Sequence, residues 1–174
     1  SPEDGERFVE LGALRDRVAV TGSLKFDIRL PASVGEQAEV LRLGWGMDRP
    51  VWVAASTHEG EEPLVLDAHE RVLARFPDAL LVLVPRHPER FDEVAQLVAD
   101  RGFDSSRRSD QPAPRPACQV YVGDTMGELP VFYAAADVAY VGGSLVPVGG
   151  HNILEPAALG VPVVFGPHMF NFAA

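Results

Sequence analysis

Short apolar runs alternate with amphipathic segments along most of the chain, a pattern typical of strands and helices in turn. The apolar runs predict strands at 18–20, 50–55, 79–84, 120–122, 138–141 and 161–165, and those at 79–84 and 138–141 are expected to be buried. The segments between them predict helices at 34–43, 61–76, 88–101, 127–136 and 152–160. The polar segment 104–116 holds three prolines and is predicted to be a surface loop.

This alternation predicts an α/β fold, namely a Rossmann-like and mostly parallel sheet with helices on both faces. We expect the 174 residues to form one domain, since the chain is long enough for a real core. In the helix 61–76 the apolar spacing predicts that Val65, Ala68, Val72 and Phe76 face inward, which leaves His69 on the surface. In such sheets ligands bind at the carboxyl ends of the strands, and each candidate block below follows a predicted strand.

The most informative block reads GGSLVPVGGHNILEPA over residues 142–157. Glycines such as Gly149 and Gly150 let another molecule approach the backbone closely. A strand, a glycine-rich loop and a helix N-terminus in this order predict a phosphate site, because free N–H groups and the helix dipole favour an anion. Asn152 and Glu155 also fit a capping box, in which both side chains serve only the helix.

Two further blocks offer polar groups at strand ends. Ser56-Thr57-His58 follows the strand 50–55 and could contact a phosphate or a carboxylate, although Ser and Thr also cap helices. Arg86 stands between two prolines after the strand 79–84, where it could form a bidentate pair with an anion. The alternative for Arg86 is a surface salt bridge to Glu89 or Glu93, and Arg90 is expected to be solvated.

The sequence of residues 142–172 resembles the donor-binding motif of one GT-B glycosyltransferase family. That family is the 3-deoxy-D-manno-octulosonic acid (Kdo) transferases of lipopolysaccharide synthesis. The resemblance covers nearly the whole chain, because four more blocks follow in the family order. They are VTGSLKFD at 20–27, ASTHEGEE at 55–62, VPRHPERF at 84–91 and GDTMGEL at 123–129.

The resemblance implies that the chain is the C-terminal, donor-binding half of a GT-B architecture, truncated at both ends. It implies that CMP-Kdo is the donor, with Glu155 on the ribose, His151 near the phosphate or sugar, and Met126 and Gly127 beside the base. The block 123–129 is equally compatible with an ordinary helix start. The family usually has a basic residue where this chain has Val148, which puts one charged donor contact in doubt.

The resemblance also implies a lipid A precursor as acceptor, bound by a separate N-terminal domain that would associate with the cytoplasmic face of the bacterial inner membrane. The family's catalytic base belongs to that domain, so no catalytic residue is assigned in this chain, and the chain alone is expected to be soluble and inactive. His168 and Asn171 are interpreted as structural residues or residues of the cleft between the domains. No cofactor is expected.

Composition narrows the possibilities a little further. The net charge of −10 argues against a general nucleic-acid surface. The single cysteine, Cys118, excludes an internal disulfide and is expected to be buried, and no acidic cluster with metal-ligand spacing is visible. No apolar run approaches the ~20 residues of a membrane span. Two other functions stay open: a GT-B enzyme that uses a UDP-sugar, and a non-catalytic nucleotide-binding module.

Overall fold

A six-stranded sheet, parallel throughout, forms the centre of residues 30–172 in the computed structural model, which describes residues 2–21 and 30–172. Its strand order is β3-β4-β2-β1-β5-β6. The strands are β1 (Val51–Thr57), β2 (Leu80–Pro85), β3 (Ser105–Arg107), β4 (Val120–Val122), β5 (Val138–Val141) and β6 (Val163–Phe165). The predicted parallel α/β fold is therefore confirmed.

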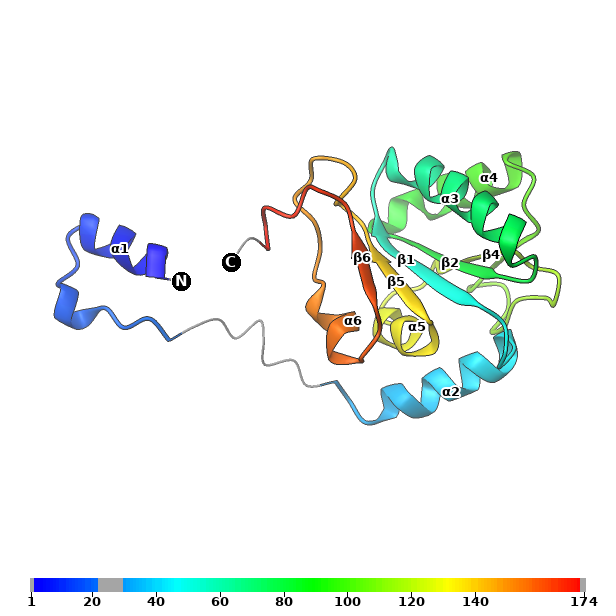
Figure 1. Ribbon diagram of the computed structural model, residues 1–174, viewed down its shortest axis with the longest axis horizontal. Helices are drawn as coiled ribbons and strands as arrows, with labels where there is room; N and C mark the ends of the chain where they lie inside the picture. Colours follow the sequence, from blue (N-terminus) through cyan, green and yellow to red (C-terminus); the bar gives the residue numbers. More distant parts are fainter. Residues whose placement is uncertain (1, 22–29, 173–174) are drawn as a thin grey trace. The chain divides into compact units, whose positions relative to one another are not determined.

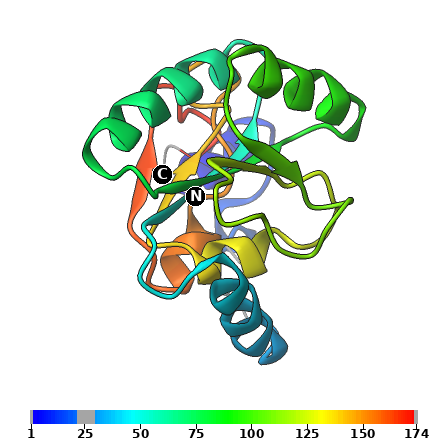
Figure 2. The ribbon, with the colours of Figure 1, turned by 90° about the vertical axis from the view of Figure 1, so that its right-hand side faces the viewer.

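Helices cover both faces of this sheet (Figures 1 and 2). Helices α3 (Glu61–Arg75) and α4 (Phe91–Asp100), the latter preceded by the short 3-10 helix η3 (Pro88–Arg90), lie on one face. Helices α2 (Ser33–Trp45), α5 (Leu129–Ala135) and α6 (Leu154–Ala158) lie on the other. No helix within residues 2–21 and 30–172 is long and apolar enough to cross a membrane.

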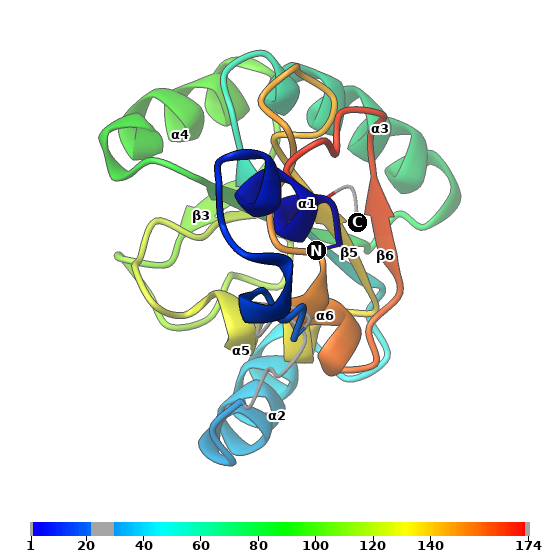
Figure 3. The ribbon, with the colours of Figure 1, turned by 90° about the vertical axis from the view of Figure 1, so that its left-hand side faces the viewer.

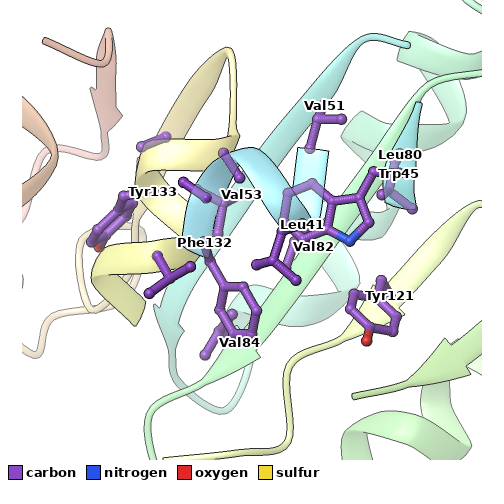
Figure 4. Packing of buried hydrophobic residues seen from close by; sticks show 14 of the residues in the cluster. Leu41, Trp45, Val51, Val53, Leu80, Val82, Val84, Tyr121, Phe132 and Tyr133 are labelled. Atoms are coloured by element: carbon purple, nitrogen blue, oxygen red, sulfur yellow. The ribbon is translucent and has the colours of Figure 1, made fainter. Parts of the chain in front are cut away.

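The core is divided between the two faces of the sheet, as a strand that is apolar at every position requires. All six residues of β2 are buried. On the α2 and α5 side, Trp45 packs at ring-centroid distances of 6.3 Å from both Tyr121 and Phe132 (Figure 4). Cys118 is fully buried among the residues of this side, as predicted.

The N-terminal residues form a separate compact unit. It contains α1 (Pro2–Glu10) and a 3-10 helix, η1 (Arg15–Arg17), which a bidentate ion pair between Arg15 and Glu6 ties together. The strand predicted at 18–20 is wrong, because these residues pair with no strand in the part of the chain that the structure describes. The motif at 20–27 lies almost wholly outside the described residues.

Three more local predictions are wrong. The segment 104–116 is not entirely loop, because β3 (Ser105–Arg107) pairs with β4. Ala68 on α3 and Phe76 just after it are exposed, whereas His69 on α3 is fully buried. His69 stays inside because both ring nitrogens find partners there: Trp52 Nε1 donates to Nδ1 over 3.0 Å, and Nε2 lies 2.9 Å from the carbonyl oxygen of Gln119.

Arg90 is not solvated, contrary to the prediction. Its guanidinium binds both carboxylate oxygens of Glu62 over 2.7 and 3.2 Å. The Glu62 side chain is only 1% exposed, so it needs a cationic partner within the fold. This ion pair connects the start of α3 to η3.

Candidate functional site

The strand order reverses between β1 and β5. From β1 the chain proceeds to β2 and β4 on one side of the sheet, and later to β5 and β6 on the other. A crevice at the carboxyl ends of two strands that flank such a reversal is the general ligand position in open parallel sheets. The glycine-rich loop 142–153 and the segment 166–172 meet at this end of the sheet (Figure 3), where the His168 N–H donates to the Ser144 carbonyl oxygen.

The end of β1 has an unusual backbone. Ser56 has a φ of 54°, which non-glycine residues seldom adopt, and the pairing of β1 with β2 shifts at this point. Gly142 explains the close approach of β5, since a Cβ there would lie 2.5 Å from the Ser56 carbonyl oxygen. The backbone therefore turns sharply before His58. Thr57 is fully buried, so its side chain is not open to a ligand in this structure.

Two imidazoles face each other across the strand reversal. The Nε2 atoms of His58 and His151 are 2.7 Å apart, and the rings are stacked with an interplanar angle of 6°. A hydrogen bond between these atoms needs one proton, so only one of the two nitrogens can carry it. His87, which follows β2, packs edge-on against His58 with a centroid distance of 5.2 Å. Sequence reasoning predicted His58 and His151 but did not include His87.

The imidazole pair is held neutral at neutral pH. The pKa of His151 is lowered to about 4, mainly by burial and in smaller part by the neighbouring His58 and Arg86. Burial likewise lowers the pKa of His58, and His87 adds to this effect. With the two Nε2 atoms bonded to each other, one of the two remaining Nδ1 atoms can donate and the other can accept at neutral pH.

Arg86 is the cation of this site. It is exposed, and its guanidinium forms no ion pair with any described residue. Its backbone N–H donates to the Thr57 carbonyl oxygen over 3.0 Å, which fixes the turn after β2 against the end of β1. The predicted alternative, a salt bridge to Glu89 or Glu93, is not formed. An exposed and unpaired guanidinium suits a phosphate or carboxylate ligand.

Glu61, to which the sequence analysis assigned no role in the site, is fully buried at the first position of α3. Its carboxylate accepts hydrogen bonds from the backbone N–H groups of Gly143, Ser144 and Leu145. The backbone groups expected to receive a phosphate are thus bound by the protein's own carboxylate. The local sequence did not predict the burial of Glu61, because an acidic residue in the first turn of a helix is compatible with an exposed or a buried side chain.

The later glycines of the loop pack against the chain's own C-terminal segment. A Cβ at Gly149 would clash with Phe170 and Asn171, and one at Gly150 would clash with Met169. Both glycines have positive φ, at 107° and 77°. Glycine is therefore required here for internal packing, a role that the sequence interpretation did not include. Asn171 also donates to the Val148 carbonyl oxygen over 3.2 Å, in keeping with the structural role predicted for it.

Glu155 is the second residue of α6, in the first turn as predicted, but the capping box is not formed in its usual way. The Asn152 side-chain oxygen accepts from the Leu154 N–H over 3.0 Å, while the Asn152 amide donates to Glu155 Oε1 over 3.1 Å. The backbone N–H of Asn152 forms no hydrogen bond with a described residue. Glu155 is partly exposed, and its second oxygen accepts no hydrogen bond from a described residue.

Met126 and Gly127 lie after β4, two strands away from the imidazole pair. Met126 is exposed, and Gly127 has a φ of 83°. The nearby buried Asp124 bonds Arg107 and Ser109, which ties this loop to the segment after β3. The structure does not bring Met126 and Gly127 into contact with the rest of the candidate site. Among the residues it describes, no cluster of three or more His, Cys, Asp or Glu is placed to hold a metal ion.

Comparison with known proteins gives clear relatives, although no protein-family profile matches the chain. The chain is 46% identical over 168 residues to the 3-deoxy-D-manno-octulosonic acid transferase of Haemophilus influenzae, covering 97% of this chain and 39% of that protein. It is also 46% identical to the enzyme of the same name from Bordetella pertussis, over 98% of this chain and 40% of that one. The chain thus spans about two fifths of the length of these curated relatives.

A solved structure matches as well. It is the crystal structure of the C-terminal CMP-Kdo binding domain of WaaA from Acinetobacter baumannii, which superposes with a TM-score of 0.77 at 44% identity. The match covers 82% of this chain and 75% of that one. The predicted GT-B C-terminal fold is confirmed by this match. The chain therefore belongs to the Kdo transferase family, within which it corresponds to the C-terminal domain.

Proposed function

We propose that this chain binds CMP-Kdo and forms the donor half of a glycosyltransferase that transfers Kdo to a lipid A precursor. The observation that carries the proposal is the 44% identity to a solved domain named for CMP-Kdo binding, in a match that covers 75% of that domain's chain. The position of the candidate site supports it, because His58, Arg86 and His151 gather where the strand order reverses.

The donor offers two anions, the phosphate of CMP and the carboxylate of Kdo. Arg86 is the exposed cation that would meet one of them, and the neutral pair of His58 and His151 would add a hydrogen-bond donor. Asn152 and Glu155 lie at the start of α6, where Glu155 would accept from a ribose hydroxyl. Held in this way, CMP would leave more readily as negative charge develops on its phosphate during transfer.

Transfer itself would need the longer protein. The acceptor hydroxyl would attack the anomeric carbon of Kdo, and the base that activates it would come from an N-terminal domain with a lipid A precursor bound. That domain would also place the enzyme at the cytoplasmic face of the inner membrane. The described residues offer the donor side alone, so we propose that the chain by itself catalyses no transfer.

Chemical-shift mapping with CMP tests the binding site directly. We expect CMP to bind weakly to the chain and to shift the amide resonances of residues 142–155 and 85–87, because these segments flank the strand reversal. UDP serves as the comparison ligand, since a UDP-sugar enzyme of the same architecture would prefer it. Shifts confined to another face would reject the site, and tighter binding of UDP than of CMP would reject the CMP-Kdo assignment.

Replacing Glu155 by glutamine separates a ribose contact from a structural role. Glutamine keeps an oxygen that can accept from Asn152, so the loss of helix stability should stay below about 1 kcal/mol. The loss of a charged hydrogen bond to ribose should weaken CMP binding by about 1.5–3 kcal/mol. The CMP dissociation constant and the midpoint of thermal unfolding are measured on the same variant.

Glu36→Gln, at an exposed position in the first turn of α2, is the matched control for the change in net charge and should alter neither quantity. Unchanged CMP binding with a lowered unfolding midpoint in Glu155→Gln would mean that Glu155 serves the helix and that the ribose is bound elsewhere.

A further inference from the structure

Glu61 makes more hydrogen bonds than any site residue predicted from the sequence. Its Oε1 accepts from the Tyr140 hydroxyl over 2.6 Å and from the N–H groups of Ser144 and Leu145 over 3.0 and 2.9 Å. Its Oε2 accepts from the N–H groups of Gly143 and His58 over 2.7 and 2.9 Å. A buried carboxylate is costly unless it is satisfied in this way.

These bonds join the two sides of the strand reversal. His58 belongs to the turn between β1 and α3, whereas residues 143–145 begin the loop after β5. Gly143 in turn lies directly beside the imidazole pair, since a Cβ there would be 3.1 Å from His151 Nε2 and 3.5 Å from His58 Cδ2. One carboxylate therefore binds both the backbone of His58 and the part of the loop that packs beside His151.

The charge of Glu61 also matters. Burial would raise the pKa of this carboxyl, but the hydrogen bonds from Tyr140 and the backbone outweigh burial and lower it below its usual value. Glu61 is thus ionised at neutral pH. Three successive N–H groups that converge on one oxygen pair form a concave anion site, and an internal anion fills it.

We propose that Glu61 is a positioning residue for donor binding, a role that rests on the proposed binding of CMP-Kdo. By occupying the backbone anion site at 143–145, it holds the loop in one conformation and leaves Arg86 and the imidazole pair to receive the anions of the donor. Glu61 does not touch the donor in this arrangement, because it is fully buried.

Replacing Glu61 by glutamine tests this role. Glutamine has one oxygen and one NH2 group, so the NH2 must face N–H or O–H donors on whichever side it lies. We expect the amide resonances of His58 and residues 143–145 to move in the unliganded variant. We also expect the dissociation constant for CMP to rise by about tenfold or more, on the scale of one lost hydrogen bond to a charged group.

Val98→Ala is the control for stability alone, because Val98 is a buried residue of α4 that takes no part in the site. It should lower the unfolding midpoint and leave the CMP dissociation constant unchanged at a temperature where every variant is folded. If Glu61→Gln does not fold, Tyr140→Phe removes one of the five bonds and should raise the dissociation constant by about threefold.

The outcomes separate the two proposals. If the unmodified chain does not bind CMP, the donor function fails, whereas shifts of the amides at 143–145 in Glu61→Gln would still show that Glu61 holds the loop. If the unmodified chain binds CMP and Glu61→Gln binds it equally well, the positioning role is overturned. If Glu61→Gln does not fold, a CMP dissociation constant for Tyr140→Phe equal to that of the unmodified chain overturns the positioning role.

Discussion

Replacing Arg90 by methionine should destabilise the chain by about 3–5 kcal/mol, the usual cost of removing one partner of a buried ion pair. Arg90 binds both oxygens of Glu62, whose side chain is 1% exposed. Methionine fills much of the same volume but leaves the Glu62 carboxylate buried without a cation. The free energy of unfolding, measured with urea at neutral pH, gives the loss.

Arg101→Met is the matched control, because Arg101 pairs with Asp67 and Glu70 at the surface, where the partners are more than half exposed. Exposed ion pairs contribute little, so this variant should behave like an ordinary surface substitution. The double variant Glu62→Met, Arg90→Met should recover much of the stability, since no buried charge remains. A loss in Arg90→Met no greater than in Arg101→Met would contradict the importance of the buried pair.

The example of Arg90 shows where sequence reasoning succeeds and where it stops. The apolar run 79–84 predicted a strand covered on both faces, and the order of strands and helices predicted a mostly parallel sheet. Nothing local to PERF at 88–91 distinguishes a solvated arginine from one paired with an acid 28 residues earlier. Pairings between distant charges depend on the packing of whole helices, which local spacing does not contain.

For the candidate site, too, the sequence predicted some features and not others. His58 and Arg86 were predicted to follow strands, and they lie at one edge of the sheet because parallel strands end together. The contact between His58 and His151 spans 93 residues, and it follows from the strand order rather than from either motif. The glycines were interpreted as openings for a ligand, yet Gly150 makes room for Met169. A glycine indicates that another group packs closely against the backbone, but the sequence does not identify that group.

His69 is a second residue that was expected at the surface, and it should make the stability of the chain depend on pH. Trp52 can only donate, so Nδ1 of His69 must accept and the ring proton lies on Nε2, which donates to the Gln119 carbonyl oxygen. Protonation of Nδ1 would break the bond from Trp52 and bury a charge. Burial accordingly lowers the pKa of His69 to about 4, although the Gln119 carbonyl opposes this shift.

The direction of this pH dependence follows from the linkage between proton binding and folding. Between pH 6.5, the ordinary histidine pKa, and about 4, the unfolded chain binds a proton at His69 that the folded chain does not. The stabilisation is therefore complete above pH 6.5 and is lost as the pH falls towards 4. At 1.36 kcal/mol for each pKa unit, the loss from this one group is about 3 kcal/mol. His58 and His151, whose pKa values are also lowered, add to the acid sensitivity in the same direction.

Glutamine at position 69 should remove the contribution of this residue. Its amide can accept from Trp52 and donate to Gln119, but it does not titrate, so the variant should lose about 3 kcal/mol less than the unmodified chain between pH 7 and pH 4. Urea unfolding at half-unit steps of pH measures both curves. Val98→Ala, which removes buried volume at a residue that does not titrate, is the control and should lower the stability at every pH without changing its dependence on pH. Parallel curves for His69→Gln and the unmodified chain would mean that His69 stays neutral in the unfolded state or titrates freely in the folded one, and the buried Trp52–His69–Gln119 chain would then carry no acid sensitivity.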